Sequence, residues 1–510
     1  MKNEKKIVLD FANKLKKRSL EFLESDVESS LEYAEKYAEL LWKNHVGLYL
    51  DLSFEKIIID SLSFLSTKNN KPIINSPLHL ITNTSDSGGH TRVIEKILYE
   101  SKNHALASVN QIDPRVKERF SSGNKYFDNL KKETKLETII NLIKVASAYK
   151  TVILHIHPSD ICSAVAAGII SKNGTKVYLY NHADFNFSFG FFSAKKILQI
   201  SSFGWNLGKK LDLKQSFVGI PYFVDPDLNL LSHSRSKQIN ILIAGSSKKF
   251  SPSLAMSIQD VMNIICEQME KKRNIQFIVC GSHGTEIFWN SLTENCKKLT
   301  KFLGVLGYDD YLKYLMTSDC LIDSFPRSSG TVYSEAIMLK KPVFGLSKVQ
   351  GYSVADSLRY SSQDQLVEEI LDFLNDKKSF SRIISEVRKR LQKFHSPKII
   401  LSRIKKIINS NSSVYLLDQL ALMKIDTSIF EKMWLHDRKL DIERKFMFFH
   451  GDDKVYYKSI LSEFLMNFPN DLIEKIEEIH EINYRYHNVL NNTKKYVLQL
   501  EEDNKNYFFS

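Results

Sequence analysis

Short apolar runs of strand length alternate with helical stretches in two successive blocks of this sequence. The first block begins near Pro77 and contains the runs LHLITNT, ALASV, TVILHIH and KVYLYNH. After the proline-punctuated polar stretch VGIPYFVDPDLNLLSHSRSKQ, the second block contains INILIAGS, IQFIVCGS, KFLGVLG, DCLIDSFP and KPVFGLS. Parallel strands need long crossover connections, usually helices, so the alternation predicts two parallel sheets with helices on their faces. We therefore expect the α/β class, with two doubly wound domains in tandem.

The chain has 510 residues, which is too long for one compact core. We expect a helical N-terminal extension over 1–75, a first Rossmann-like domain over 76–235 and a second over 236–410. Residues 411–510 combine helical patterns with many aromatic residues, and we expect them to form a helical C-terminal appendage. Ligands of doubly wound sheets bind beyond the carboxyl ends of the strands, so site residues should directly follow the strand runs.

The composition, with 43% hydrophobic and 25% charged residues, is that of an ordinary globular protein. No run approaches the roughly 18 consecutive apolar residues of a membrane span. The amino terminus mixes charges and lacks the apolar core of a secretory signal, so we expect a cytoplasmic protein. The five cysteines are odd in number and widely spaced, which favours buried free thiols over disulfides or a zinc site.

The formal net charge of +12 is concentrated in one window. Between Lys377 and Lys406 there are eleven Lys or Arg residues and one acid, Glu386. Such a window is either a solvated helical face or a surface attracted to anionic lipids or nucleic acid. Aromatic residues for base stacking are sparse there, so a membrane ranks above nucleic acid. We expect no nucleic-acid partner, and peripheral association with the inner face of the cell membrane.

One segment of the second block, LIDSFPRSSGTVYSEAIMLKKPVFGL, has the pattern of a strand, a small-residue loop, a helix and another strand. Ser329, Gly330 and Thr331 lie where the helix should begin, so unpaired N–H groups there could bind a phosphate. Glu335 follows, and a carboxylate at that point suits the hydroxyls of a ribose. The segment suggests a nucleotide-diphosphate site. An ordinary capped helix between two buried strands is the alternative.

The first strand run of the first block is followed by SDSGGHTR, which leads directly into a helical stretch. Gly88 and Gly89 would let the backbone turn sharply and approach a ligand, and Arg92 would bring a cation to the helix entrance. His90 and Arg92 are candidate contacts for a sugar or an acceptor molecule bound at this loop. The loop has neither the GxGxxG spacing nor the Lys-Ser/Thr ending of a Walker loop. A tight turn without a ligand is the alternative.

Histidines end two later strand runs of the same block, in HIHPSD and NHAD. An imidazole can take a proton from an attacking hydroxyl, so His182 is a candidate base, and Asp184 could orient it or act as the base itself. His157 is a candidate contact for the acceptor or the sugar. His155 and His157 also share a strand face as a metal-ligand pair would, but no third ligand is evident, and we expect no metal. A structural hydrogen bond is the alternative for each histidine.

The strand run INILIAG of the second block ends in SSKKFSP. The Lys249 ammonium could neutralise the charge that develops on a departing diphosphate. Two solvated loop lysines are the alternative.

Two tandem Rossmann-like domains with these motifs resemble the GT-B glycosyltransferases over roughly residues 76–400. KFSP looks like the K-x-[DN]-P element, and FPRSSGTVYSE like the phosphate loop and ribose-binding acid, of bacterial adhesin-glycosylating and O-GlcNAc transferases. SDSGGHTR, YNHADF and LLWKNHVG are similar to elements of bacterial polysaccharide glycosyltransferases, as found in lipopolysaccharide and capsule synthesis. Ser251 replaces the Asp or Asn of the lysine element, and Arg327 stands where many retaining enzymes have a glutamate, so the stereochemistry stays open.

The resemblance implies that Lys249 contacts the diphosphate, Ser329 to Thr331 hold it, Glu335 binds the ribose and His182 lies at the reacting sugar or acceptor. It implies a hexosyl- or N-acetylhexosaminyl-transferase that needs no cofactor and uses a nucleotide-sugar donor, expected to be UDP-linked. The acceptor would be a surface glycan or a lipid-linked molecule. A nucleotide-sugar 2-epimerase of the same fold and a noncatalytic nucleotide- or glycan-binding scaffold are the alternatives.

Overall fold

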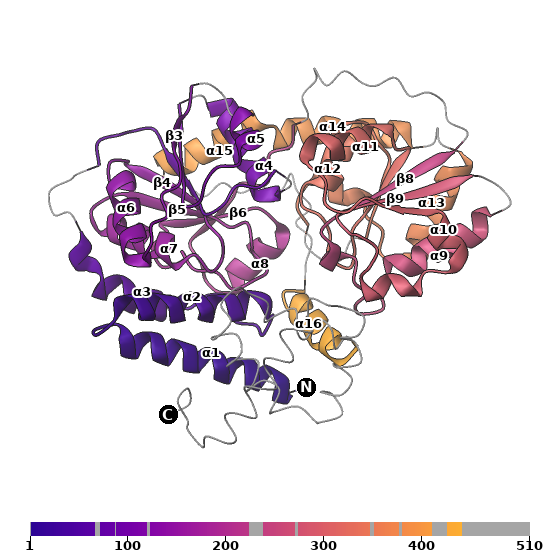
Figure 1. Cartoon of the computed structure of the whole chain (residues 1–510). Coiled ribbons are helices and arrows are strands. Elements are labelled where there is room, and N and C mark those ends of the chain that lie inside the picture. Colours follow the sequence, from indigo (N-terminus) through magenta and orange to yellow (C-terminus); the bar gives the residue numbers. More distant parts are fainter. Residues whose placement is uncertain are drawn as a thin grey trace.

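The computed structural model describes residues 2–440 with several internal gaps (Figure 1). The gaps are residues 67–71, 87, 102, 120–122, 224–237, 271–273, 347–350, 377–379 and 411–425. Most of the predicted C-terminal appendage, 411–510, therefore lies outside the described residues. The part that is described contains one helix, α16 (Ile429–Leu440).

Three helices form the N-terminal extension: α1 (Lys2–Phe22), α2 (Val27–Lys43) and α3 (Leu52–Ser61), followed by the short η1 (Ser63–Leu65). The Asp26 and Asp51 carboxylates cap α2 and α3 by accepting backbone N–H groups of the first turn. Figure 1 shows the three helices along one side of the first sheet. Helix α1 packs on α2, and buried residues of all three helices share one apolar cluster with the first sheet domain, so the extension belongs to the same core.

The first sheet has seven parallel strands in the order β3-β2-β1-β4-β5-β6-β7. The strands are β1 (Leu78–Ile81), β2 (Ala105–Ser108), β3 (Lys125–Phe127), β4 (Thr151–His155), β5 (Lys176–Tyr180), β6 (Lys196–Gln199) and β7 (Gln215–Phe217). The helices are α4 (Gly89–Ser101), α5 (Pro114–Glu118), α6 (Lys135–Ala146), α7 (Ile161–Lys172) and α8 (Ser202–Lys210). The strand order reverses between β1 and β4, which is where such sheets bind ligands.

The second sheet has five parallel strands in the order β10-β9-β8-β11-β12. The strands are β8 (Ile239–Ala244), β9 (Ile275–Cys280), β10 (Thr300–Phe302), β11 (Cys320–Asp323) and β12 (Val343–Phe344). The helices are η2 (Ser247–Lys249), α9 (Ile258–Met269), η3 (Ile287–Ser291), α10 (Glu294–Lys298), α11 (Tyr308–Thr317), α12 (Val332–Met338), η4 (Val354–Leu358), α13 (Gln363–Asn375), α14 (Ser381–His395) and α15 (Pro397–Ser410). Here the order reverses between β8 and β11. Two doubly wound sheets in tandem confirm the predicted fold class.

The chain crosses back to the first domain after the second sheet is complete. Helix α15 packs against α4 of the first domain, and Figure 1 shows it above the first sheet. The buried Arg403 side chain donates a hydrogen bond to the Val218 carbonyl at 2.9 Å. Arg388 of α14 donates to the Met338 carbonyl at 2.8 Å. Two of the cations between Lys377 and Lys406 therefore make hydrogen bonds within the fold.

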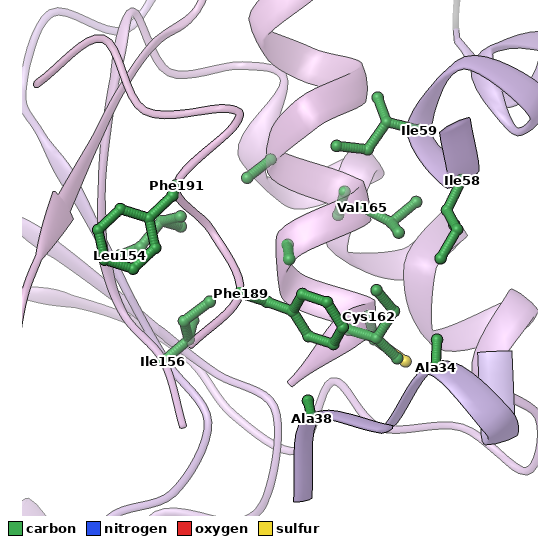
Figure 2. Packing of buried hydrophobic residues seen from close by; sticks show 14 of the residues in the cluster. Ala34, Ala38, Ile58, Ile59, Leu154, Ile156, Cys162, Val165, Phe189 and Phe191 are labelled. Atoms are coloured by element: carbon green, nitrogen blue, oxygen red, sulfur yellow. The ribbon is translucent and has the colours of Figure 1, made fainter. Parts of the chain in front are cut away.

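The N-terminal helices attach to the first domain through close packing on α7 (Figure 2). Ile59 of α3 is fully buried against Gly168 of α7, where a Cβ atom would lie 2.4 Å from the Ile59 Cδ1 atom. Burying one such isoleucine contributes about 1.5–3 kcal/mol. Phe189, Val165 and Ala38 complete this part of the core. A glycine at 168 is thus required by the approach of α3 to α7.

All five cysteines are buried and free, as predicted. Among the residues that the structure describes, no helix has the length and apolar character needed to cross a bilayer.

Candidate functional site

The loop that follows β11 is organised around a buried carboxylate. Asp323, the last residue of β11, accepts hydrogen bonds from the Ser324 amide at 2.9 Å and from the Ser329 amide at 3.2 Å. The Ser329 hydroxyl in turn accepts from the Tyr333 amide at 3.2 Å. The Ser329 N–H was expected to hold a phosphate, but Asp323 already occupies it. In the described structure, no acceptor lies within hydrogen-bonding distance of the Gly330 and Thr331 amides.

Lys249 is placed directly beside this loop. Its Nζ atom lies 3.3 Å from the Ser328 carbonyl oxygen, although β8 and β11 are far apart in the sequence. The two strands are neighbours in the sheet, so the loops beyond their carboxyl ends meet. Burial lowers the pKa of Lys249, and the nearby carboxylate of Asp323 opposes this shift. Helix α12 has seven residues, so the cation rather than a long helix dipole gives the loop its positive potential.

Arg359 neutralises the carboxylate beneath the loop. Its guanidinium lies 2.8 Å from an Asp323 oxygen, contacts Asp356, and stacks on the Tyr333 ring at 4.0 Å. Burial alone would lower the pKa of Arg359, but the two carboxylates raise it above its ordinary value. The Asp356 carboxylate also accepts the Ser353 amide at 2.6 Å. Without Arg359, Asp323 would repel any anion bound to this loop.

Glu335 lies on α12 and points at the first domain. Its carboxylate accepts a hydrogen bond from Lys96 Nζ of α4 at 2.7 Å and one from the Tyr308 hydroxyl at 3.3 Å. Glu335 is 1% exposed and Lys96 is 7% exposed, so this is a buried ion pair between the domains. Glu335, which the sequence suggested as a ribose-binding acid, therefore lies at the interface and is paired with a lysine that sequence reasoning missed; ribose binding stays a prediction.

A second charged group joins the two domains next to this pair. Arg92 is buried, pairs with Glu95 at 2.6 Å and stacks on the Tyr308 ring at 4.3 Å. Asp86 accepts hydrogen bonds from Arg119 at 2.6 Å and from the Tyr308 amide at 3.2 Å. Arg92 was expected to meet the sugar or the acceptor. It instead forms part of the interface, because its side chain is enclosed by Tyr308 and Glu95.

The paired glycines before α4 have an ordinary backbone. Neither Gly88 nor Gly89 has a positive φ, so the sharp turn expected there needs no glycine. A Cβ atom on Gly89 would meet nothing within 4 Å, whereas one on Gly88 would lie 3.2 Å from the Ser85 Cβ atom. Gly89 is the first residue of α4 and is exposed. The described residues around Gly89 would accommodate a side chain, so they do not themselves require a glycine there.

His182 is half-buried at the carboxyl end of β5. Its Nε2 atom lies 2.8 Å from His155 Nδ1, and its ring packs on that of His90, with centroids 4.4 Å apart. Burial lowers the pKa of His182 well below its ordinary value and that of His90 to about 4. Both rings are therefore neutral near pH 7. A neutral His182 has a lone pair available, as a general base requires.

Asp184 does not orient His182. Its Oδ2 atom accepts a hydrogen bond from Ser201 at the start of α8, and its buried Oδ1 atom has no hydrogen-bond partner among the residues that the structure describes. Burial raises the pKa of Asp184 to about 7. The group that holds His182 is His155, which the sequence had suggested only as a possible metal ligand. In the part of the chain that the structure describes, no three His, Cys, Asp or Glu side chains are placed to hold a metal ion.

His157 lies away from the His182 group, where α2 of the N-terminal extension contacts both domains. Its Nδ1 atom lies 2.9 Å from the Ser159 hydroxyl, and its ring meets the Trp42 ring edge-on at 4.5 Å. On the other side, Lys248 Nζ of the second domain lies 5.4 Å from the Trp42 ring centroid. Helix α2 therefore inserts an aromatic ring between the loops after β4 and β8. Trp42 belongs to the LLWKNHVG element of the sequence, but no site role was predicted for it.

The buried Asp184 carboxyl makes stability depend on pH. Its folded-state pKa of about 7 exceeds the ordinary 3.8, so between these values the folded chain binds a proton that the unfolded chain lacks. Raising the pH through this window therefore removes stability. Because other groups titrate in the same range, the comparison is between variants: from pH 5 to pH 8, the thermal midpoint of Asp184→Asn should rise relative to that of the wild type at the same pH. The exposed Asp309→Asn should behave as the wild type; an Asp184→Asn curve parallel to the wild-type curve would contradict the shift.

No protein-family model matches the sequence, and no curated protein matches it significantly. Solved structures do match. A mutant of the O-GlcNAc transferase from Thermobaculum terrenum superposes with a TM-score of 0.54 at 12% identity, over 78% of this chain and 81% of that one. HepE from Anabaena, in complex with UDP and glucose, gives 0.49 at 12% identity, over 65% and 99%. The Neisseria meningitidis UDP-GlcNAc 2-epimerase bound to UDP-GlcNAc gives 0.42 at 12% identity, over 65% and 100%.

The superposition above a TM-score of 0.5 covers most of both chains. At 12% identity it establishes the fold and not the activity. The strand order reverses between β1 and β4 in the first sheet and between β8 and β11 in the second, so both sheets are doubly wound. The chain therefore has the GT-B fold, with two tandem Rossmann-like domains.

Proposed function

We propose that this chain is a glycosyltransferase that moves a hexosyl or N-acetylhexosaminyl group from a nucleotide-diphosphate sugar, expected to be UDP-linked, to a surface-glycan or lipid-linked acceptor. The observation that supports it most directly is the position of Lys249 at the loop after β11. The Lys249 ammonium contacts the Ser328 carbonyl of the loop that also carries the Gly330 and Thr331 amides, for which the described structure shows no hydrogen-bond acceptor. Such a group of donors suits a diphosphate.

Residues of both domains suit the other steps of a transfer reaction, namely deprotonation of the acceptor and departure of the diphosphate. In the proposal, the acceptor hydroxyl forms a bond to the anomeric carbon while the bond from that carbon to the diphosphate breaks. His182 takes the hydroxyl proton, and Lys249 stabilises the charge on the leaving diphosphate. Glu335 binds the ribose, and Gly89 lies near the transferred sugar. No metal ion or other cofactor is needed in this scheme, because Lys249 and the loop amides supply the positive charge.

The location of the protein is part of the same proposal. We expect it in the cytoplasm, attached to the inner membrane face through cations of residues 377–406 that the fold leaves exposed. Lys389 and Arg390 of α14 and Lys405 and Lys406 of α15 are exposed. A lipid-linked acceptor would be reached from that surface.

A thermal-shift screen of nucleotide sugars followed by product analysis tests the function. A ligand at one hundred times its Kd stabilises the native state by about 2.7 kcal/mol, so the preferred donor should stand out. Transfer or slow hydrolysis of that donor is the expected result. Epimerised donor without acceptor would identify a 2-epimerase, and tight binding without turnover a noncatalytic scaffold.

The donor site itself is tested by Lys249→Ala. Hydrogen bonds to charged groups contribute about 1.5–3 kcal/mol, so the Kd for UDP measured by calorimetry should rise about 10- to 100-fold. The exposed Lys301→Ala in β10 of the same domain should leave the Kd unchanged. Equal affinities for the wild type and Lys249→Ala would place the diphosphate elsewhere.

A further inference from the structure

Four histidines from four separate segments form a continuous row of ring-to-ring hydrogen bonds across the first sheet. His104 Nδ1 lies 2.9 Å from His79 Nε2, and His79 Nδ1 lies 2.9 Å from His155 Nε2. His155 Nδ1 then lies 2.8 Å from His182 Nε2. His79, His104 and His155 are at most 4% exposed. We call these four residues the histidine row.

The row follows from strand register. His79 pairs with Leu106 and with Ile153, so His104 and His155, each two residues away from those partners, share its face of the sheet. His182 continues the same face, four residues beyond Tyr178, which also pairs with Ile153. His104 precedes β2 and His182 follows β5. Because all strands are parallel, the row runs from the amino edge of the sheet to the carboxyl edge, where the proposed chemistry takes place.

The order of the ring atoms restricts how protons are placed. Burial lowers the pKa of every ring in the row, so each is neutral and has one N–H group. Each link needs one N–H donor and one lone pair, and every link joins an Nδ1 atom to an Nε2 atom. The four rings must therefore all be protonated on Nδ1 or all on Nε2. The tautomer of His182 is thus tied to that of His104.

We propose that the histidine row is a proton relay that sets the tautomer of His182 and removes the proton that His182 accepts. This inference rests on the proposed transferase function. In the Nε2–H state, His182 presents the lone pair of Nδ1 to the acceptor hydroxyl. His79, His104 and His155 then act as positioning residues, since they touch neither donor nor acceptor in this scheme.

The relay takes up one proton at His182 and releases one proton at His104. His182 Nδ1 takes the hydroxyl proton, its Nε2 proton passes to His155 Nδ1, and the Nε2 proton of His155 passes to His79 Nδ1. His79 passes its own Nε2 proton to His104 Nδ1, and His104 releases its Nε2 proton to water. The row has then changed from the Nε2–H to the Nδ1–H state without charging any buried ring. Loss of the His182 Nδ1 proton to water and uptake at His104 Nε2 reverse the change.

The surroundings of His182 and His104, the two ends of the histidine row, fit proton transfer from His182 to His104. His182 is half-buried and contacts only the rings of His90, His155 and Tyr180 in the stacked group. His104 retains 4% exposure, and the charge of Lys405, exposed on α15, lowers its pKa further. A proton arriving at His104 is therefore not retained as an imidazolium.

Nitrogen-15 NMR of the full-length protein labelled at histidine tests the tautomer linkage without any activity. We expect couplings through the three N–H···N bonds and one common tautomer for His79, His155 and His182. In His104→Asp, the carboxylate accepts from His79 Nε2, so all three rings should be protonated on Nε2. Different tautomers in His79 and His182, or an imidazolium in the row at pH 7.5, would overturn the proposal.

Kinetics test the transfer step. His104→Asn can keep the bond to His79 but has no second ring nitrogen to release a proton. We expect its kcat to fall about 10-fold or more with an unchanged KM for the donor, because a general base contributes about 10²–10⁴-fold. Its solvent-isotope dependence should be linear in the deuterium fraction, where the wild type is curved. Equal kcat and equal isotope dependence would refute the relay.

The matched control is Thr175→Val, which removes a buried 3.0 Å hydrogen bond to the Tyr149 carbonyl at the same amino edge of the sheet. It should keep the wild-type kcat and isotope curve. If the wild type transfers no sugar with any donor, the proposed function fails, and the NMR result alone then decides whether the row is tautomerically linked.

Discussion

Arg359→Ala should lower the free energy of unfolding by about 3–5 kcal/mol, because it leaves two buried carboxylates without their counter-charge. Asp323 is fully buried and Asp356 is 8% exposed, and both contact the guanidinium. The loss should appear in urea denaturation followed by tryptophan fluorescence. Affinity for UDP should fall as well, since an uncompensated Asp323 lies beneath the proposed phosphate loop.

The control for this change is Arg382→Ala. Arg382 is 90% exposed and pairs with Glu386 on the same helix, so its loss should change stability by no more than about 0.5 kcal/mol. Arg359→Lys should also lower stability, because a lysine ammonium lacks the planar fork of donors with which the guanidinium contacts both carboxylates. Wild-type stability in Arg359→Ala would show that the two carboxylates are hydrated or protonated and that the loop does not depend on Arg359.

The second large effect concerns the ion pair between the domains. Removing either partner of the Lys96–Glu335 pair leaves a buried charge, so Lys96→Met and Glu335→Leu should each cost about 3–5 kcal/mol. The double variant should recover most of that loss, because no unpaired charge remains. Urea denaturation of the wild type, both single variants and the double variant forms a complete cycle.

The same four proteins separate stability from ligand binding. Glu335→Leu and the double variant should both bind UDP more weakly than the wild type, since both lack the proposed ribose acid. Lys96→Met should retain more of the affinity, because Glu335 is still present. Additive losses in the cycle would mean that the two side chains do not interact in solution. The exposed pair Lys313–Asp310 on α11 serves as the control and should show no coupling beyond about 0.5 kcal/mol.

Several candidate site residues could be predicted from the sequence because side chains of suitable chemistry come soon after a strand run. Lys249 ends the short helix η2 after β8, Glu335 lies on the helix that follows the loop after β11, and parallel sheets gather the carboxyl ends of their strands at one edge. His182 was proposed for the same reason, and the roles of all three residues stay predictions. Two of their charged neighbours were not predicted, since Lys96 and Arg359 lie in ordinary amphipathic or loop segments.

Two residues predicted from local pattern have structural partners that the pattern did not indicate. The amide of Ser329 looked available because helix starts generally leave N–H groups unpaired, but a buried carboxylate at the end of the preceding strand accepts it. Arg92 looked like a ligand contact because it starts a helix after two glycines. Its actual surroundings come from the other domain, and no local pattern encodes them.

The sequence by itself determined the two tandem parallel sheets, the helical N-terminal extension, the buried free cysteines and the loops in which the site residues lie. These depend on hydrophobic periodicity and turn chemistry, which act over a few residues. Only the tertiary structure decided which charges pair between the domains and that His104, His79, His155 and His182 form one row. Strand order and register bring those residues together, and both are set by packing between segments far apart in the chain.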